Sequence, residues 1–335
     1  MNAEQDALVG LAAEILAGRT SNEQLAKLEV SETRVDDELW RELAEAGLLG
    51  IAVPDTFGGA GLGFTELCLL LEQQGRYVAP VPLWENLLAA FVLTHHATEE
   101  QQRQWLPGLV AGTTRLGVVA PLDGRSSVTW SDGALAGSAL TTSRADALVV
   151  VTDDAVVLCE APAGTPVETT THALAYEVEL TGVPAVRLDA SADSVRDHLR
   201  VGLAAAQLGV ADAGIREAAQ HLSQREQFGR PLATFQATTH QLGDAYCDAQ
   251  AMRATLWQAV WELSEDGDAA RDVAVATWWA TDAGERIQHT VQHLHGGLGA
   301  DTTYPVHRRL LWTMRTNALL GGPSRQLVRL AQHLA

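Results

Sequence analysis

Basic residues are scarce in this chain of 335 residues. Lys and Arg together number 23 against 42 Asp and Glu, which gives a formal net charge of −19. An acidic surface repels polyanions, so the composition argues against a nucleic-acid partner and against binding to an anionic membrane surface. An anionic ligand would need a local cluster of Arg side chains or backbone N–H groups.

Long apolar runs are also lacking. No stretch reaches the roughly 18 uncharged apolar residues that a membrane-spanning helix needs, yet 47% of the residues are hydrophobic, which suits folded cores. The first ten residues, MNAEQDALVG, are acidic and polar rather than a basic segment followed by an apolar one. The sequence therefore predicts no secretory signal, no membrane partner and a cytoplasmic location.

Cysteine is rare as well. Cys68, Cys159 and Cys247 lie far apart without the spacing of a metal site. We expect them to be buried small apolar side chains in a reducing compartment.

Two periodicities divide the chain. Amphipathic helical segments fill residues 1–112, and Thr98 is a candidate N-cap because acidic residues follow it. Short β-rich runs separated by Gly, Asp, Ser and Pro fill residues 113–193, among them LGVVA, ALVVV, AVVLCE and YEVELTG. Long helical stripes return over residues 194–335. The predicted fold is α+β and multidomain: an N-terminal α-helical domain, a small middle β domain and a C-terminal four-helix bundle.

Four local runs resemble one family. LWRELAEAGLLGIAVPDTFGGAGLG begins at Leu39, TEEQQRQWLPGLVAG at Thr98, REQFGRPLATFQ at Arg225 and HLHGGLGADTTYPVHRRL at His293. In this order they resemble the acyl-CoA dehydrogenases over nearly the whole chain. The resemblance implies that family's three-part fold, bound FAD and α,β-dehydrogenation of a CoA thioester.

The run that begins at Arg225 resembles the family's flavin-binding segment. A planar guanidinium such as that of Arg225 can hold a pyrophosphate by paired charge-assisted hydrogen bonds. The resemblance adds Phe228 and Gln236, and it implies that these groups reach an FAD whose ring lies in the other subunit. Taken alone, Arg225 would be a solvated helix charge.

Gly296, Gly297 and Gly299 follow a helix, so they are not a dinucleotide-fold fingerprint. The resemblance implies that they let the backbone approach the adenine end of FAD, whereas a plain helix C-cap is the alternative. The family has Gln three positions before the first glycine, where this chain has His293, and the adjacent Gln292 can substitute.

Two further features of the C-terminal part have plain interpretations. His289 and His293 are four apart on a helix, but no third ligand accompanies them, so we predict no metal site. Five tryptophans are interpreted as core or subunit contacts; they are Trp257, Trp261, Trp278, Trp279 and Trp312.

The catalytic carboxylate is missing. The family places the glutamate that removes the α-proton at one of two positions, and counting along this chain puts Leu320 and Leu199 there. Leucine cannot accept a proton. The two runs expected to contact the flavin ring also depart from the family pattern. VVAPLDGRSS keeps only Pro121 and a loose Asp123–Gly124 pair of that pattern, and SALTTSRADALVVV keeps only Thr141 and Thr142.

This combination resembles the base-lacking subunit of actinobacterial heterotetrameric acyl-CoA dehydrogenases of steroid side-chain degradation. It implies a non-catalytic subunit that completes a shared FAD site, a base-containing partner subunit, a sterol-type acyl-CoA substrate and electron-transfer flavoprotein as the electron acceptor. Two alternatives stay open: a homomeric dehydrogenase that uses Asp301, Glu285 or Asp197 as the base, and a flavin-free scaffold.

Overall fold

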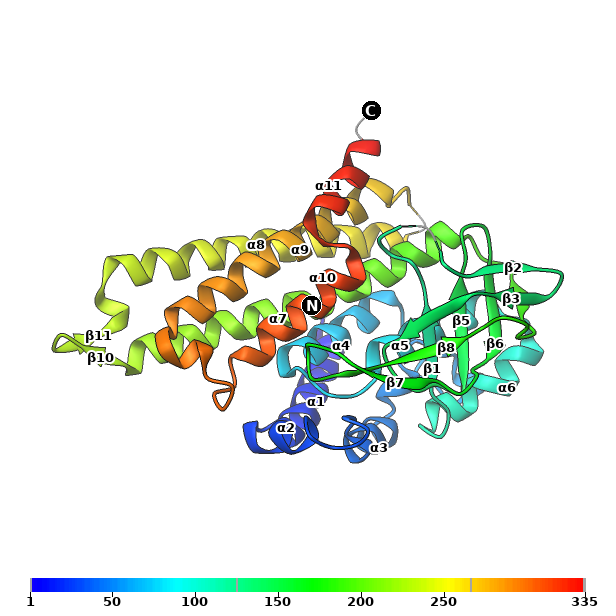
Figure 1. Ribbon diagram of the computed structural model, residues 1–335, viewed down its shortest axis with the longest axis horizontal. Coiled ribbons are helices and arrows are strands. Elements are labelled where there is room, and N and C mark those ends of the chain that lie inside the picture. Colours follow the sequence, from blue (N-terminus) through cyan, green and yellow to red (C-terminus); the bar gives the residue numbers. More distant parts are fainter. Residues whose placement is uncertain (1, 125, 266, 334–335) are drawn as a thin grey trace. The chain divides into compact units, whose positions relative to one another are not determined.

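A computed structural model describes residues 2–124, 126–265 and 267–333 (Figure 1). The chain forms two compact units. The first comprises Met1–Leu70 and Pro80–Gly202, and the second comprises Leu71–Ala79 and Leu203–Ala335. Each unit is described by itself.

The first unit begins with short helices whose ends are set by local side chains. Asn2, Ser21 and Thr98 each form a capping box at a helix start, so the predicted N-cap at Thr98 is confirmed. The helices are α1 (Ala3–Arg19), α2 (Asn22–Leu28), α3 (Asp37–Glu45), the start of α4 (Phe64–Tyr77), α5 (Leu83–His96) and α6 (Glu99–Val110), with 3₁₀ turns η1 (Leu48–Gly50) and η2 (Asp55–Phe57).

The β region of this unit contains two sheets and a hairpin. A four-stranded sheet has the order β1 (Leu116–Val119), β5 (Ala147–Val151), β6 (Val156–Glu160) and β9 (Val186–Leu188), with β1 and β5 parallel. A three-stranded antiparallel sheet has the order β4 (Ser138–Thr141), β8 (Leu174–Glu179) and β7 (Thr165–Glu168). Strands β2 (Thr129–Ser131) and β3 (Ala134–Ala136) form the hairpin.

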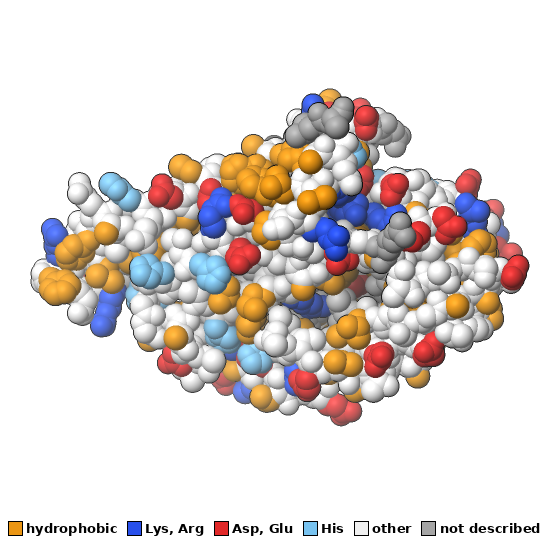
Figure 2. All heavy atoms as spheres, turned by 45° about the horizontal axis from the view of Figure 1, so that its top comes forward, with side chains coloured by type: hydrophobic (Ala, Val, Ile, Leu, Met, Phe, Trp, Pro, Cys, Tyr) orange, Lys and Arg blue, Asp and Glu red, His pale blue; other side chains and the backbone are white. Residues whose placement is uncertain are grey.

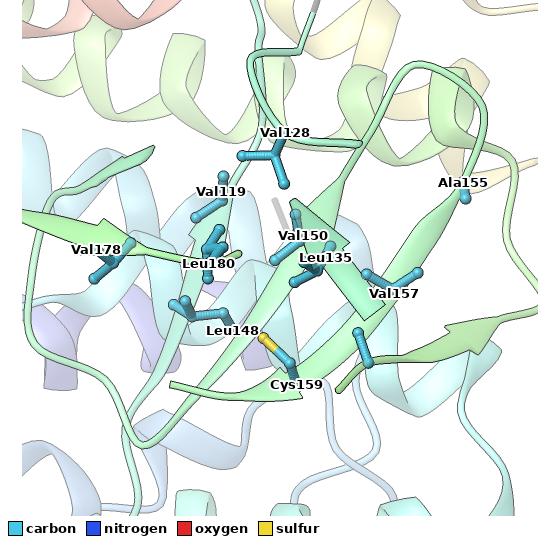
Figure 3. Packing of buried hydrophobic residues seen from close by; sticks show 11 residues of the cluster. Val119, Val128, Leu135, Leu148, Val150, Ala155, Val157, Cys159, Val178 and Leu180 are labelled. Atoms are coloured by element: carbon cyan, nitrogen blue, oxygen red, sulfur yellow. The ribbon is translucent and has the colours of Figure 1, made fainter. Parts of the chain in front are cut away.

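The core of this region explains why β5 is apolar throughout. Every residue of β5 is buried, as a central strand covered on both faces requires. Figure 3 shows side chains from β1, β3, β5, β6 and the end of β8 converging on one cluster. The four β-rich runs expected from the sequence are confirmed as β1, β5, β6 and β8.

The second unit is a helical bundle. It contains the remainder of α4, α7 (Ala192–Gln224) from Leu203 onward, α8 (Gln236–Ser264), α9 (Ala270–Leu294), α10 (His307–Leu320) and α11 (Gly322–Gln332). Shorter elements are β10 (Glu226–Gln227), β11 (Arg230–Pro231), η3 (Leu232–Thr234) and η4 (Gly296–Ala300). The apolar stripe of α9, which includes Val273, Ala280, Ile287 and Val291, is buried, as its helical spacing predicts.

Helices α4 and α7 approach each other at two glycines. A Cβ on Gly75 would lie 1.8 Å from the Ala206 carbonyl oxygen, and one on Gly209 would lie 1.9 Å from that of Glu72. The Arg253 guanidinium of α8 donates to Glu72 at 3.1 Å and to Asp212 at 2.8 Å. Burial raises the pKa of the Glu72 carboxyl, and Arg253 opposes that rise.

Some expectations need correction. Cys68 and Cys159 are buried, and burial raises the pKa of the Cys159 thiol to about 11, but Cys247 is exposed on α8. None of the five bundle tryptophans is fully buried, and Trp261 is 55% exposed, so these rings are not fully buried core residues, and their interpretation as subunit contacts stays a prediction. A tryptophan stripe does not by itself reveal whether its ring faces the core or the surface. No helix among the described residues is long and apolar enough to cross a membrane.

Candidate functional site: one end of the helical bundle

A short hairpin follows α7 and carries the predicted flavin-binding residues. It turns through Phe228 (φ 55°) and Gly229 (φ 76°), the left-handed pair that a two-residue hairpin loop requires. Phe228 is 92% exposed. The Arg225 side chain is exposed, and no carboxylate of the described residues lies within 4.0 Å of it. An exposed cation without a counter-ion is available to an anionic ligand.

The chain then returns to the start of α8, so that the hairpin β10–β11 lies at one end of the bundle, between α7 and α8 (Figure 1, left). The Leu232 N–H donates to the Arg225 carbonyl at 2.8 Å, and the rings of Phe228 and Phe235 lie 6.2 Å apart. Gln236 is the exposed first residue of α8. Figure 2 shows apolar and basic side chains together at this end.

Sequence reasoning missed a contact that fixes this hairpin. The Arg230 guanidinium lies 4.1 Å from the centre of the Phe235 ring, a cation–π geometry. Both residues lie in the run from Arg225 to Gln236, but the amino-acid order does not show which arginine stacks on a ring and which stays available to a ligand.

The glycine turn follows α9. Gly296 (φ 59°) takes the left-handed conformation that ends the helix, so the helix-end interpretation holds for this residue. A Cβ on Gly299 would lie 2.3 Å from the Gln292 carbonyl oxygen, whereas nothing lies within 4 Å of a Cβ on Gly296 or Gly297. The backbone at Gly296 and Gly297 is therefore open to a ligand.

The polar residues before the turn differ in accessibility. His293 is exposed, whereas Gln292 is half-buried, and its side-chain Oε1 would lie 3.0 Å from a Cβ on Gly299. His295 was not predicted as a site residue. It is 3% exposed and stacks on His221, with ring centres 4.5 Å apart.

The two positions expected to hold the catalytic base are buried hydrocarbon. Leu320 is 0% exposed and Leu199 is 1% exposed. The carbonyl oxygen of Leu320 accepts a hydrogen bond from the Gln326 side chain, whose Oε1 in turn accepts from the Thr277 hydroxyl at 2.9 Å. Neither position can take a proton from a substrate.

The alternative acids are engaged within the chain. Asp301 accepts from the Thr303 N–H and hydroxyl at 2.8 Å each, and these bonds lower its pKa. Glu285 accepts from the Asn317 amide at 3.1 Å. Asp197 pairs with Arg200 at 3.0 Å. A general base that works near neutral pH needs a carboxyl whose pKa is raised, whereas the Thr303 hydrogen bonds lower the pKa of Asp301.

The two runs expected to contact a flavin ring use their polar groups internally. Thr141 donates to the Ser143 carbonyl at 3.0 Å, and Thr142 donates to Glu85. In the run Val118–Ser127, position 125 lies outside the described residues, and the Leu122 carbonyl accepts from Arg200.

His289 and His293 are both exposed on α9, and His289 lies 3.7 Å from Glu285. Over residues 2–124, 126–265 and 267–333, no group of three or more His, Cys, Asp or Glu side chains is arranged to hold a metal ion.

Comparison with known proteins identifies the class. The acyl-CoA dehydrogenase N-terminal domain matches residues 2–113, and the acyl-CoA dehydrogenase C-terminal domain matches residues 191–334. This chain belongs to the acyl-CoA dehydrogenase family, whose members are FAD-dependent oxidoreductases, and the predicted family and fold are confirmed.

Within that family the chain is similar to several named proteins. It is 35% identical to the acyl-CoA dehydrogenase FadE27 of Mycobacterium tuberculosis, over 99% of this chain and 97% of the relative. It is 32% identical to FadE28 of the same organism, over 92% and 96%.

Two solved structures whose names each give a pair of proteins are similar to this chain. A variant of the Tcur3481–Tcur3483 steroid ACAD (acyl-CoA dehydrogenase) has a TM-score of 0.93 at 43% identity, over 98% of this chain and 97% of that chain. The ChsE4–ChsE5 complex from Mycobacterium tuberculosis has a TM-score of 0.92 at 35% identity, over 100% and 98%.

Proposed function

We propose that this chain is the non-catalytic, FAD-site-completing subunit of a heterotetrameric acyl-CoA dehydrogenase in the cytoplasm. The enzyme performs α,β-dehydrogenation of a CoA thioester, and the partner subunit supplies the flavin-ring pocket, the acyl-CoA site and the glutamate. Electrons leave to electron-transfer flavoprotein. The observation that carries the proposal is the buried leucine at both positions where the family has its base, Leu320 and Leu199.

The residues at the end of the bundle fit the pyrophosphate and adenosine part of FAD. Arg225 offers an exposed guanidinium with no carboxylate of the described residues within 4.0 Å, and Gly296 and Gly297 offer open backbone. Phe228, Gln236, Gln292 and His293 would complete the contacts. When bound, FAD supplies the hydride acceptor of the reaction. The residues of this chain would hold its phosphates and exclude water from them.

The flavin ring would lie against the partner subunit. The hydroxyl groups of Thr141 and Thr142 are both engaged within this chain, so the β region offers a poorer ring site than the family pattern implies. The nucleotide-contacting end keeps the residues of the family pattern, whereas the ring-contacting region has lost most of them. An enzyme in which one subunit contacts the nucleotide and the other holds the flavin ring predicts this difference.

The substrate class that we propose is a CoA thioester with a sterol-type side chain. The support is similarity to a protein named as a steroid ACAD, at 43% identity over nearly the full length of both chains. The paired names of both solved structures also support a partner subunit of the same family.

The test is the colour and activity of the purified protein. We expect the chain expressed alone to be colourless and inactive. Co-expression with a base-containing homologue encoded beside it should give a yellow complex that oxidises a sterol-type acyl-CoA. A yellow and active chain on its own would instead establish the homomeric dehydrogenase, and a colourless, inert mixture with every such homologue would establish the scaffold.

A further inference from the structure

Two histidine rings connect the two segments that carry the proposed FAD contacts. His221 lies one helical turn before Arg225, and its carbonyl accepts from the Arg225 N–H at 2.8 Å. His295 directly precedes Gly296. The two rings are stacked, with centres 4.5 Å apart and planes inclined by 29°. The stack is therefore a direct side-chain link between the Arg225 turn and the glycine turn.

His295 has further contacts beside the stack. Its Nδ1 donates to the Val291 carbonyl at 2.7 Å, and because a carbonyl only accepts, Nδ1 carries the proton. The ring of Tyr304 covers it at 5.5 Å between centres. His295 is 3% exposed, and its Nε2 has no hydrogen-bond partner among the described residues. A buried acceptor without a hydrogen-bond partner lowers the free energy of unfolding. His295 occupies this position despite that cost at its Nε2.

The surroundings keep His221 neutral near pH 7. Burial, then His295 and then Arg225, lower the pKa of its imidazole. Tyr304 is a further titratable group against His295. Glu217, one turn before His221 on α7, pairs with Arg309 at 2.8 Å, and His307 hydrogen-bonds to the Tyr304 carbonyl at 2.6 Å.

We propose that His221 and His295 are positioning residues, which set the separation between the Arg225 guanidinium and the Gly296–Gly297 backbone that a bound dinucleotide requires. This inference rests on the proposed function. Pre-organising two contact points before the ligand arrives lowers the entropy cost of binding. Neither imidazole needs to touch the ligand for this role.

The first experiment uses the full chain without a cofactor. Hydrogen–deuterium exchange is compared for the wild type, His221→Ala, His221→Phe and His289→Ala. His289 is an exposed histidine of α9 outside the stack, so it is the matched control. We expect His221→Ala to speed exchange in residues 225–236, which closely follow the substituted position. Exchange should also become faster in residues 295–306, which are far from that position in the sequence. His221→Phe keeps an aromatic ring and should restore protection, and His289→Ala should leave both segments unchanged. Faster exchange in residues 225–236 alone would overturn the coupling.

The second experiment uses the FAD-loaded complex with the partner subunit. We expect His221→Ala to weaken FAD binding roughly tenfold, with the turnover number at saturating FAD unchanged. Equal FAD affinity in His221→Ala and His289→Ala would overturn the positioning role. A wild-type complex that binds no FAD would overturn the proposed function instead, and the exchange experiment would still decide whether the stack couples the two segments.

Discussion

Arg200 donates two hydrogen bonds to the carbonyl oxygen of Leu122, from Nε at 3.2 Å and from a terminal nitrogen at 3.0 Å. Its other terminal nitrogen pairs with Asp197 at 3.0 Å, and all three residues are buried. Leu122 lies in the run where the family pattern places a flavin-ring strand. Because the Arg200 guanidinium binds the Leu122 carbonyl, it connects this loop to α7 within the chain. This contact supports the proposal that a partner subunit binds the flavin ring.

Substitution of Arg225 should remove FAD from the mixed complex. Arg225→Ala deletes the exposed cation proposed to face the pyrophosphate, and a hydrogen bond to a charged group contributes about 1.5–3 kcal/mol. We expect FAD affinity to fall about tenfold to a hundredfold, measured from the flavin absorbance of the purified complex after dialysis. Arg271→Ala, whose side chain is 64% exposed beside Asp272, is the control. Equal flavin content in the two variants would refute the pyrophosphate role of Arg225.

Restoring a carboxylate at the lost base position should not restore turnover. Leu320 is 0% exposed and its carbonyl is held by Gln326, so Leu320→Glu would place an acid in the core rather than beside a substrate. We expect no turnover in the chain alone and a loss of roughly 3 kcal/mol in the free energy of unfolding. Urea titration measures the second quantity.

The matched control for that substitution is Leu327→Glu, because Leu327 is 53% exposed. A surface substitution of this kind should change the free energy of unfolding by about 0.5 kcal/mol or less. Turnover in Leu320→Glu, or equal stability of the two variants, would show that position 320 faces an open pocket.

Local patterns predicted the elements better than they predicted the contacts between them. Thr98 was recognisable as an N-cap because the capping signal lies within one turn, and β5 was recognisable because a central strand is apolar at every position. The His221–His295 stack joins residues from two different helices, and no local pattern marks it. Cys247 shows the same limit, since a small residue on a helix carries no sign of which face it occupies.

The site was predictable only in part for the same reason. The motif around Arg225 predicts a cation for a phosphate, but both Arg225 and Arg230 satisfy that requirement in the sequence. The three-dimensional fold separates them, because Arg230 stacks on Phe235 and Arg225 does not. The leucines at the two expected base positions were visible in the sequence, because they depend on the identity of a residue rather than on its contacts.

Enlarging Gly209 should separate α4 from α7. A Cβ at this position would lie 1.9 Å from the Glu72 carbonyl oxygen, and backbone cannot move aside as a flexible side chain can. We expect Gly209→Ala to lower the free energy of unfolding by about 3 kcal/mol. Gly243→Ala on α8, where nothing lies within 4 Å, should raise it by about 0.5–1 kcal/mol. Thermal unfolding of both variants measures the difference, and a stabilised Gly209→Ala would contradict the close approach.

Acid should destabilise the first unit through His198. Its ring lies 4.8 Å from that of Phe64 and 5.1 Å from that of Phe91, and its Nδ1 donates to the Ser194 carbonyl at 2.9 Å. Burial lowers the pKa of this imidazole, and the nearby His95 and His96 lower it further, while the Ser194 hydrogen bond and Asp197 act in the opposite direction.

The sign of the pH effect follows from the direction of that shift. The folded state holds His198 neutral, whereas an unfolded chain protonates it near pH 6.5. Below that pH the unfolded state binds more protons, so the free energy of unfolding falls as the pH falls toward the lowered pKa of the folded state. His198→Phe keeps the ring packing and removes the titration, so its stability should fall less than that of the wild type between pH 7 and pH 5.

Urea titrations across this range measure the slope. His95 and His96 are present in both proteins, so the difference between the two slopes isolates His198. His289→Gln is the control, because it removes an exposed histidine of α9 that does not belong to the ring cluster of His198, Phe64 and Phe91. Parallel curves for His198→Phe and the wild type would show that the imidazole is protonated as readily in the folded chain as in the unfolded one.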